Sequence, residues 1–163
     1  MSYFVTGGTG FIGRFLIGNL LKRKGSIHVL VRKASMKKFD AMVKKQGWDP
    51  KRVIAVPGDM TAANCGLTAA QVRALTAKIQ HFFHLAAIYD LTASAEEQQA
   101  ANIDGTRHAL DLAAALKVKC FHHASSIAAA GLYPGVFRED MFDEAEGLDD
   151  PYLRTKHESE GLV

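Results

Sequence analysis

The stretch Thr6-Gly7-Gly8-Thr9-Gly10-Phe11-Ile12-Gly13, at the start of the chain, decides the fold. Before it, Tyr3-Phe4-Val5 is an apolar run with the length of a short buried strand. After it, apolar side chains recur at helical spacing from Phe11 to Leu21. Three glycines therefore fill a turn between a strand and a helix.

These glycines suit a loop that binds a dinucleotide. Gly7 takes backbone angles that a Cβ forbids, Gly10 lets a pyrophosphate approach the main chain, and Gly13 lets the helix pack closely on the strand. The free N–H groups and the positive dipole end of the helix then face the phosphates. Glycines also mark plain turns, but their place between strand and helix favours dinucleotide binding. The predicted binding residues of this loop are Gly7, Thr9, Gly10, Phe11, Ile12 and Gly13.

The composition predicts one domain with an uneven charge. The 163 residues are 48% hydrophobic, enough for a single core, and the formal net charge is +3. Residues 1–58 hold twelve Lys or Arg and two Asp or Glu. Residues 59–163 hold eight Lys or Arg and fifteen Asp or Glu. A basic N-terminal half suits a ligand with several phosphates, and a solvated basic face is the alternative. No nucleic-acid recognition pattern accompanies the charge, so nucleic acid is not an expected partner.

Cysteine usage and hydropathy indicate a cytoplasmic protein. Cys65 and Cys120 are isolated, with neither metal-ligand spacing nor a disulfide framework, so no metal site is predicted. The first strand begins at about residue 2, which leaves no room for a signal or transit peptide. No apolar run approaches the roughly 20 residues of a membrane span, and we expect no integral membrane segment.

Strand-like and helix-like segments alternate along the whole chain. Thr68 and Gln71 form a capping box at one helix start, and Asp149-Asp150-Pro151 begins the last helix. This alternation predicts an α/β fold, a doubly wound parallel sheet of the Rossmann type, with ligands at the carboxyl ends of the strands. The expected strands are 3–5, 26–31, 52–56, 80–87 and 119–126, and the expected helices are 11–24, 36–47, one from 68, 93–116 and one from 151.

The residues after the second strand favour NADP(H) over NAD(H). In this kind of fold an acidic residue there accepts from the ribose 2′-hydroxyl, whereas an arginine accommodates a 2′-phosphate. Here Arg32, Lys33 and Ser35 follow the strand, and the next carboxylate is Asp40. Arg14 supplies a second cation for the same phosphate. An Arg32 that is merely exposed is the alternative.

Three more segments fall where the cofactor is expected. Asp59, after the third strand, accepts from an adenine amino group or else forms a turn. The small-residue segment Leu85-Ala86-Ala87 lets the backbone approach the cofactor. Asn102, on the long alanine-rich helix, contacts the site or faces solvent.

A catalytic group is predicted near the end of the chain. Tyr152 and Lys156 are four residues apart and share one helix face. An ammonium close to a phenol stabilises the phenolate and makes proton transfer near neutral pH accessible. Ser126, at the end of the fifth strand, holds a substrate carbonyl while the phenol protonates it and a nicotinamide delivers hydride. The Tyr-x-x-x-Lys spacing alone is common, so its weight comes from following the glycine loop and the serine strand.

In this order, the segments resemble the extended branch of the short-chain dehydrogenase/reductase superfamily. Each of its motifs has a counterpart: the nucleotide fingerprint Gly7–Gly13, the adenine loop Gly58-Asp59-Met60, the fourth-strand motif His84–Ala87, the helix segment Asn102–Thr106, the serine strand Ser125–Gly131 and the pair Tyr152–Lys156. The resemblance implies cofactor contacts from Met60, Tyr152 and Lys156 as well.

Within that branch the chain is most similar to the N-terminal part of two-domain bacterial fatty acyl-CoA reductases, which are thioester reductases. Sugar-nucleotide epimerases usually carry Val-Tyr-Gly where this chain has Ala129-Ala130-Gly131. The segments that carry the likeness are Val31–Lys33, His84–Leu91, Ser126–Gly131, Arg138–Phe142, Pro151–Lys156 and Lys156–Glu160.

This resemblance implies NADPH-dependent reduction of a fatty acyl thioester, on CoA or an acyl carrier protein, to an aldehyde or onward to an alcohol. Extended members run to roughly twice this length, so we expect residues 1–163 to be an N-terminal Rossmann fragment, truncated before the substrate-binding part. Such a fragment is expected to bind cofactor poorly, form homo-oligomers and turn over slowly. The alternatives are a hydroxysteroid- or sugar-nucleotide-type dehydrogenase or epimerase, and a non-catalytic NADP(H)-sensing module.

Overall fold

The computed structural model describes residues 1–89 and 92–163. Its strands are β1 (Ser2–Thr6), β2 (Ile27–Val31), β3 (Val53–Pro57), β4 (Ile79–His84) and β5 (Cys120–His123). The α-helices of the described residues are α1 (Phe11–Leu20), α2 (Met36–Lys45), α3 (Ala69–Leu75), α4 (Ala95–Gln98), α5 (Gly105–Leu116) and α6 (Pro151–Gly161). A π-helical segment, η3 (Gln99–Asp104), joins α4 to α5, and short 3₁₀ turns include η1 (Lys33–Ser35) and η4 (Ile127–Ala130).

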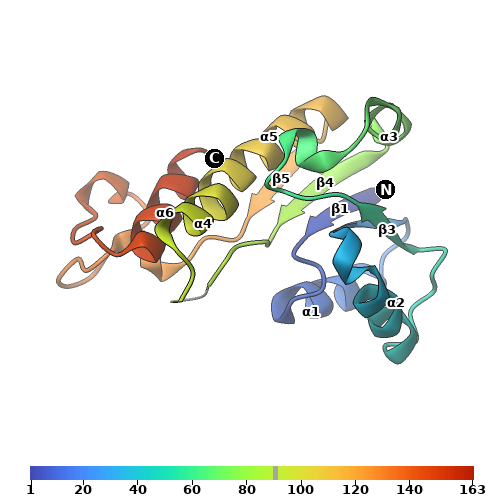
Figure 1. Ribbon diagram of the computed structural model, residues 1–163, viewed down its shortest axis with the longest axis horizontal. Coiled ribbons are helices and arrows are strands. Elements are labelled where there is room, and N and C mark those ends of the chain that lie inside the picture. The colour runs from blue at the N-terminus through green and yellow to red at the C-terminus, as the bar shows by residue number, and fades with distance from the viewer. Residues whose placement is uncertain (90–91) are drawn as a thin grey trace.

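The five strands form one parallel sheet in the order β3-β2-β1-β4-β5. The chain therefore moves outward from β1 in one direction, returns, and continues in the other, which is the doubly wound arrangement. Helices α1 and α2 lie on one side of the sheet, and α3 and α5 lie on the other (Figure 1). The predicted fold class is confirmed.

The alternation of side chains along β1 explains why both faces are covered. Tyr3 and Val5 point to the face that packs against α1 and α2, and Phe4 between them points to the face that packs against α5. All three are at most 2% exposed. A strand buried on both faces is expected to be apolar at its centre, as these three residues are.

The strand predicted at 80–87 is shorter in the structure, and its neighbour gives the reason. β4 ends at His84 because β1 ends at Thr6, where Gly7 turns the chain with φ +70°. Beyond that point the Ala86 N–H donates to the Thr6 hydroxyl, at 3.2 Å, instead of to a strand. β5, predicted to reach residue 126, stops early for the same reason, since its partner β4 has ended.

The helix predicted at 93–116 is not a single α-helix. It begins at α4, where Ser94 and Glu97 form a capping box, and passes through η3 before continuing as α5. The wider π turn places Asn102 on the inner side, where it is 2% exposed. A π-helical turn within an α-helix often occurs at a functional site, because it redirects one side chain.

The two predicted helix starts are confirmed. Thr68 and Gln71 make the capping box at the start of α3. At α6, the Asp150 carboxylate accepts from the backbone N–H groups of Tyr152 and Leu153, and Pro151 occupies the first turn. α6 packs against η4 and against α4 and η3, the first two parts of the helical stretch predicted at 93–116 (Figure 1).

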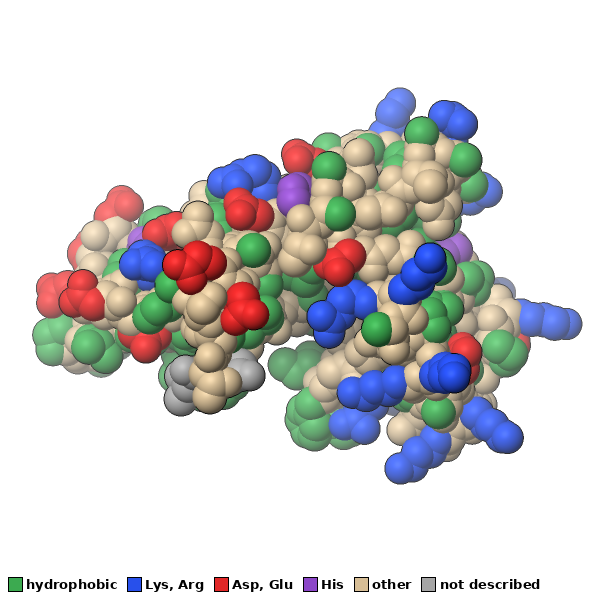
Figure 2. Space-filling view, in the orientation of Figure 1, with side chains coloured by type: hydrophobic (Ala, Val, Ile, Leu, Met, Phe, Trp, Pro, Cys, Tyr) green, Lys and Arg blue, Asp and Glu red, His purple; other side chains and the backbone are tan. Residues whose placement is uncertain are grey.

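The surface reproduces the uneven charge of the sequence. Lys and Arg side chains gather around α1 and α2, and Asp and Glu gather at the opposite end, around α4 and α6 (Figure 2). No helix in the described part of the chain is long and apolar enough to cross a membrane. Asp90 and Leu91, the last residues of the family-like segment His84–Leu91, lie outside the described residues.

Candidate functional site

The glycine loop between β1 and α1 is packed as the sequence predicts. A Cβ on Gly7 would lie 2.7 Å from the Ala86 nitrogen, and one on Gly13 would lie 2.4 Å from the Gly7 carbonyl oxygen. Both distances are too short for any side chain. Gly7 also has positive φ, so its predicted role in the turn and the predicted role of Gly13 in close packing both agree with the structure.

A cleft of about 320 Å³ opens where this loop meets the carboxyl ends of β2, β3 and β4. Gly10, the residue before α1, lines the cleft and supplies no capping side chain. The backbone N–H groups of that turn thus remain for an anionic ligand. Ten of the predicted cofactor residues line the cleft: Gly7, Thr9, Gly10, Arg32, Ser35, Asp59, Met60, Leu85, Ala86 and Ala87.

Five other predicted cofactor residues of this half do not line the cleft. Phe11 and Ile12 are 71% and 63% exposed, Gly13 is buried in the loop packing, and Lys33 is exposed on η1. Arg14 borders a separate groove of about 190 Å³, which also includes Thr9, Lys38 and Lys45.

Asp59 forms the turn that was one of the two roles predicted for it, and the contact with an adenine amino group stays a prediction. Its Oδ1 accepts from the Thr61 backbone N–H at 3.0 Å and from the Thr61 hydroxyl at 2.9 Å, which is a turn of the Asx type. The same residue borders the cleft at the end of β3.

The wall of the cleft formed by the segment after β4 is held by a buried histidine, His84. Its Nδ1 lies 2.8 Å from Thr6 Oγ1, and its Nε2 lies 3.1 Å from Thr106 Oγ1. The Thr106 hydroxyl donates to the Asn102 carbonyl oxygen at 2.6 Å, so it accepts from Nε2–H, and Thr6 donates to Nδ1. This chain of bonds requires the neutral Nε2–H tautomer. Burial above all, then the charges of His123 and Lys156, lower the pKa of His84 to about 3.

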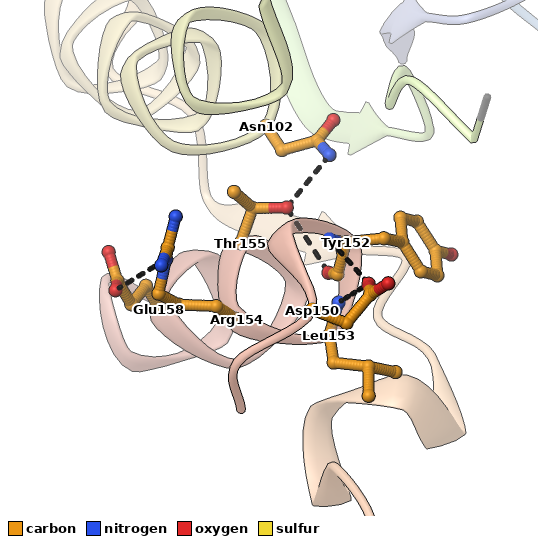
Figure 3. A network of polar contacts seen from close by, with 7 residues as sticks. All are labelled: Asn102, Asp150, Tyr152, Leu153, Arg154, Thr155 and Glu158. Atoms are coloured by element: carbon orange, nitrogen blue, oxygen red, sulfur yellow. Dashed lines mark hydrogen bonds and ion pairs between the residues drawn. The ribbon is translucent and has the colours of Figure 1, made fainter. Parts of the chain in front are cut away.

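Asn102 connects the same segment to the last helix. Its Oδ1 accepts from the Ile88 N–H at 2.8 Å, and its Nδ2 donates to the Ile88 carbonyl at 3.2 Å and to Thr155 Oγ1 at 3.1 Å. The Thr155 hydroxyl in turn donates to the Tyr152 carbonyl at 3.2 Å (Figure 3). Asn102 is buried, so the solvent-facing alternative is wrong, and its side chain holds the segment after β4 against the first turn of α6 (Figure 3).

Two of the three predicted catalytic residues border a second cleft, of about 710 Å³. Ser126 lies there at the start of η4 and Tyr152 in the first turn of α6. The ring of Tyr89 stacks edge-to-face on the ring of Tyr152, with centroids 4.9 Å apart. Leu132 and Leu153 add apolar side chains to the lining, as an acyl chain would require.

Lys156, the third predicted catalytic residue, is 3% exposed and lies one turn after Tyr152 on α6. Its Nζ donates to the Ala124 carbonyl at 3.0 Å. Burial lowers the pKa of the Lys156 ammonium, and the nearby Glu160 carboxylate opposes that shift. Glu160 in turn accepts from the Ser125 hydroxyl, so α6 is tied to the end of β5 at two points.

The two clefts lie next to each other along the segment after β4. Ile88 borders the cleft at the glycine loop, and Tyr89, the next residue, borders the cleft that holds Ser126 and Tyr152. Sequence reasoning missed Tyr89 and Thr155. The aromatic residue that directly follows the small-residue segment was a signal for Tyr89, whereas the role of Thr155 depends on a contact with Asn102, 53 residues away.

Comparison with known proteins agrees with this geometry. The NAD-binding family model described as "Male sterility protein" matches residues 5–163. A linear gramicidin synthase polypeptide of Brevibacillus parabrevis is 32% identical over 98% of this chain. A Drosophila melanogaster protein named as a fatty acyl-CoA reductase, CG8303, is 27% identical over 94% of it. The crystal structure of the terminal R domain from the myxalamid PKS-NRPS biosynthetic pathway superimposes on 99% of the chain with a TM-score of 0.84 and 28% identity.

This chain spans less than half of each of these proteins: 3% of the gramicidin synthase polypeptide, 30% of CG8303 and 44% of the R domain. With a family model that covers residues 5–163, the glycine loop, the serine strand and the Tyr/Lys helix in place, the chain belongs to the NAD-binding "Male sterility protein" family of extended short-chain dehydrogenases/reductases, which includes thioester reductase R domains and fatty acyl-CoA reductases.

Proposed function

We propose that residues 1–163 are the NADP(H)-binding Rossmann domain of a longer reductase, which converts a fatty acyl thioester to an aldehyde. The coarser assignment, an NAD(P)-dependent oxidoreductase, follows from the family. The finer points of the proposal are the thioester substrate, the preference for NADP(H) and the roles of individual residues.

One observation carries the proposal: the cleft at the glycine loop adjoins the cleft that holds Ser126 and Tyr152. A dinucleotide whose phosphates lie at the start of α1 can extend along Leu85–Ile88 toward Tyr152. Small residues at Ala86 and Ala87 leave room for such a ligand against the main chain. A substrate in the second cleft is then next to the reactive end of the cofactor.

The side chains of the second cleft fit carbonyl reduction. A bound nicotinamide cofactor supplies the hydride. The Tyr152 hydroxyl donates its proton to the carbonyl oxygen as negative charge develops there. Ser126 Oγ accepts from the Ala128 N–H at 3.1 Å, which orients the hydroxyl and leaves its own proton for the same oxygen.

The first product of a thioester is a hemithioacetal, formed when hydride adds to the carbonyl carbon and a proton adds to the oxygen. The carbon–sulfur bond then breaks, the hydroxyl proton is transferred to sulfur, and an aldehyde and a free thiol leave. Lys156 lies one turn after Tyr152 on α6, where its ammonium donates to the Ala124 carbonyl, and its positive charge would stabilise the phenolate left after Tyr152 gives up its proton.

Two features support NADP(H) as the cofactor. Arg32 and Ser35 border the cleft where β2 ends, which is where the 2′ position of the adenosine ribose lies in folds of this order. Among the described residues that line this cleft, Asp59 is the one carboxylate, and it follows β3, not β2. A guanidinium at the end of β2 favours a 2′-phosphate over a 2′-hydroxyl.

The test uses the whole protein that contains this chain, with a long-chain acyl-CoA, the same acyl group on an acyl carrier protein, and a fatty aldehyde as separate substrates. Oxidation of NADPH and NADH is followed together with release of thiol. Tyr152→Phe removes the proton donor. Tyr133→Phe, which changes a half-buried tyrosine that does not line the second cleft, is the matched control.

We expect NADPH oxidation with one thiol released per turnover, retained in Tyr133→Phe and reduced at least a hundredfold in Tyr152→Phe. The thioester that is reduced with the higher kcat/KM shows whether the natural carrier is CoA or an acyl carrier protein. No thiol release from either thioester, with NADPH or NADH oxidised by the fatty aldehyde alone, contradicts the thioester assignment and supports the dehydrogenase alternative. Cofactor binding with no turnover of any substrate, unchanged in Tyr152→Phe, supports a sensing module instead.

A further inference from the structure

Strand pairing brings three possible metal ligands together outside both clefts. His81 in β4 pairs directly with Cys120 in β5, and His122 lies two residues further along β5. Residues two apart on a strand share a face, so all three side chains project from the same side of the sheet. One ligand atom from each residue lies within 4.8 Å of the others.

The contacts that His122 makes with its two neighbours, one through each ring nitrogen, are close in length to the ligand separations of a tetrahedral zinc site. His81 Nδ1 lies 3.1 Å from His122 Nε2, and Cys120 Sγ lies 3.9 Å from His122 Nδ1. Zinc bonds of about 2.05 Å to nitrogen and about 2.3 Å to sulfur, at tetrahedral angles, separate two nitrogens by roughly 3.3 Å and a nitrogen from a sulfur by roughly 3.6 Å. His122 binds the ion through one of its two nitrogens, so side-chain rotations that bring that nitrogen toward both neighbours form all three bonds.

The imidazole rings are already oriented toward each other. Those of His81 and His122 stack with centroids 5.3 Å apart and an interplanar angle of 21°. The Phe83 ring stacks on the His122 ring, with centroids 4.3 Å apart and an interplanar angle of 7°.

A metal ion can reach this cluster from solvent. His81, Cys120 and His122 are half-buried, not buried, and none of them lines either cleft. On this face of the sheet, α1 and α2 pack over side chains of β1, β2 and β3. The cluster lies beyond them, over β4 and the outermost strand β5.

We propose that His81, Cys120 and His122 bind one Zn²⁺ ion, with a water molecule as the fourth ligand, and that the ion links β5 to β4. Two nitrogens and one thiolate are a ligand set that Zn²⁺ favours over Mg²⁺ and Ca²⁺. The assignment is independent of the proposed reaction, since the site is separate from the residues that bind cofactor and substrate.

The test titrates the metal-free, reduced chain with Co²⁺ and then with Zn²⁺. Co²⁺ reports tetrahedral geometry through its visible absorption bands and thiolate ligation through a charge-transfer band in the near ultraviolet. The ligand variants are Cys120→Ser and His122→Gln. His28→Gln, which changes a half-buried histidine of β2, is the control. Far-ultraviolet circular dichroism checks that each variant is folded, and His81→Gln replaces any that is not.

We expect one Co²⁺ per chain, displaced by Zn²⁺, with both sets of bands present in the unmodified chain and in His28→Gln. Cys120→Ser should lose the charge-transfer band, and each ligand variant should weaken Zn²⁺ binding at least tenfold. Zn²⁺ at a hundredfold excess over its dissociation constant should raise the unfolding midpoint by about 5–10 °C. Absence of stoichiometric binding, absence of the thiolate band, or equal Zn²⁺ affinity in the ligand variants and in His28→Gln would overturn the proposal.

Discussion

His84 should make this domain sensitive to mild acid. In the fold its two ring nitrogens are used by the hydroxyls of Thr6 and Thr106, and the bond pattern accommodates the neutral ring. Burial lowers its pKa from 6.5 to about 3. In the unfolded chain the ring regains its ordinary pKa and binds a proton on acidification, whereas the folded chain does not.

The magnitude follows from linkage. Between pH 6.5 and pH 3 the unfolded state holds one more proton at this residue, so the free energy of unfolding falls by about 1.4 kcal/mol for each pH unit. Between pH 7.5 and pH 5.0 the loss is about 2 kcal/mol, and below pH 3 it reaches about 5 kcal/mol. His123, whose pKa is lowered to about 4 by burial and then by Lys156, changes stability in the same direction.

Urea unfolding at pH 7.5, 6.0 and 5.0 measures this slope. His84→Gln keeps an amide donor and an acceptor but does not titrate, so it should be less stable at pH 7.5 and should lose about 2 kcal/mol less on going to pH 5.0. His108→Gln is the control, since that histidine is half-buried and contacts the Met60 carbonyl at 2.9 Å. Equal pH slopes in His84→Gln and the unmodified chain would refute the reasoning.

Three further substitutions test the loop and the two clefts. Arg32→Asp should weaken NADPH binding at least tenfold and leave NADH binding within about threefold of the unmodified chain. The affinity for each cofactor is measured by the change in cofactor fluorescence on binding. Equal losses of affinity for both cofactors would contradict a contact with the 2′-phosphate. Ser126→Ala should lower kcat/KM of the whole protein about a hundredfold, and Ser125→Ala, which loses only the contact with Glu160, should stay within about threefold. Gly13→Ala should lower the free energy of unfolding, measured in urea, by about 1–3 kcal/mol, because its Cβ would meet the Gly7 carbonyl oxygen at 2.4 Å. Gly18→Ala, whose Cβ would meet no atom within 4 Å, should raise the free energy of unfolding by about 0.5–1 kcal/mol. Similar effects of the two substitutions would argue against the packing described here.

The features that the sequence predicts well are local. The glycine loop, the capping box of Thr68 and Gln71 and the start of α6 at Asp150 each depend on residues within a few positions of one another. The strand order could be inferred too, because strand–helix alternation leaves few arrangements of a parallel sheet. Strand ends were less predictable, since the length of β4 depends on where its neighbour β1 stops.

The features that were missed depend on contacts between distant residues. Asn102 is an ordinary helical asparagine in the sequence, and only the π turn directs its side chain to Ile88 and Thr155. The cluster of His81, Cys120 and His122 exists only in the register that pairs β4 with β5. A cysteine and a histidine 39 and 41 positions from His81 carry no recognisable spacing, and so no metal site was predicted.

The most direct test of the central claim follows the hydride itself. The whole protein is given NADPH labelled with deuterium at the transferred position of the nicotinamide, together with a long-chain acyl thioester, and the products of a single turnover are analysed by mass spectrometry. The account predicts an aldehyde with one deuterium on its carbonyl carbon and one equivalent of free thiol, both absent in Tyr152→Phe. An intact thioester after NADPH has bound, or an aldehyde that carries no deuterium, would contradict it.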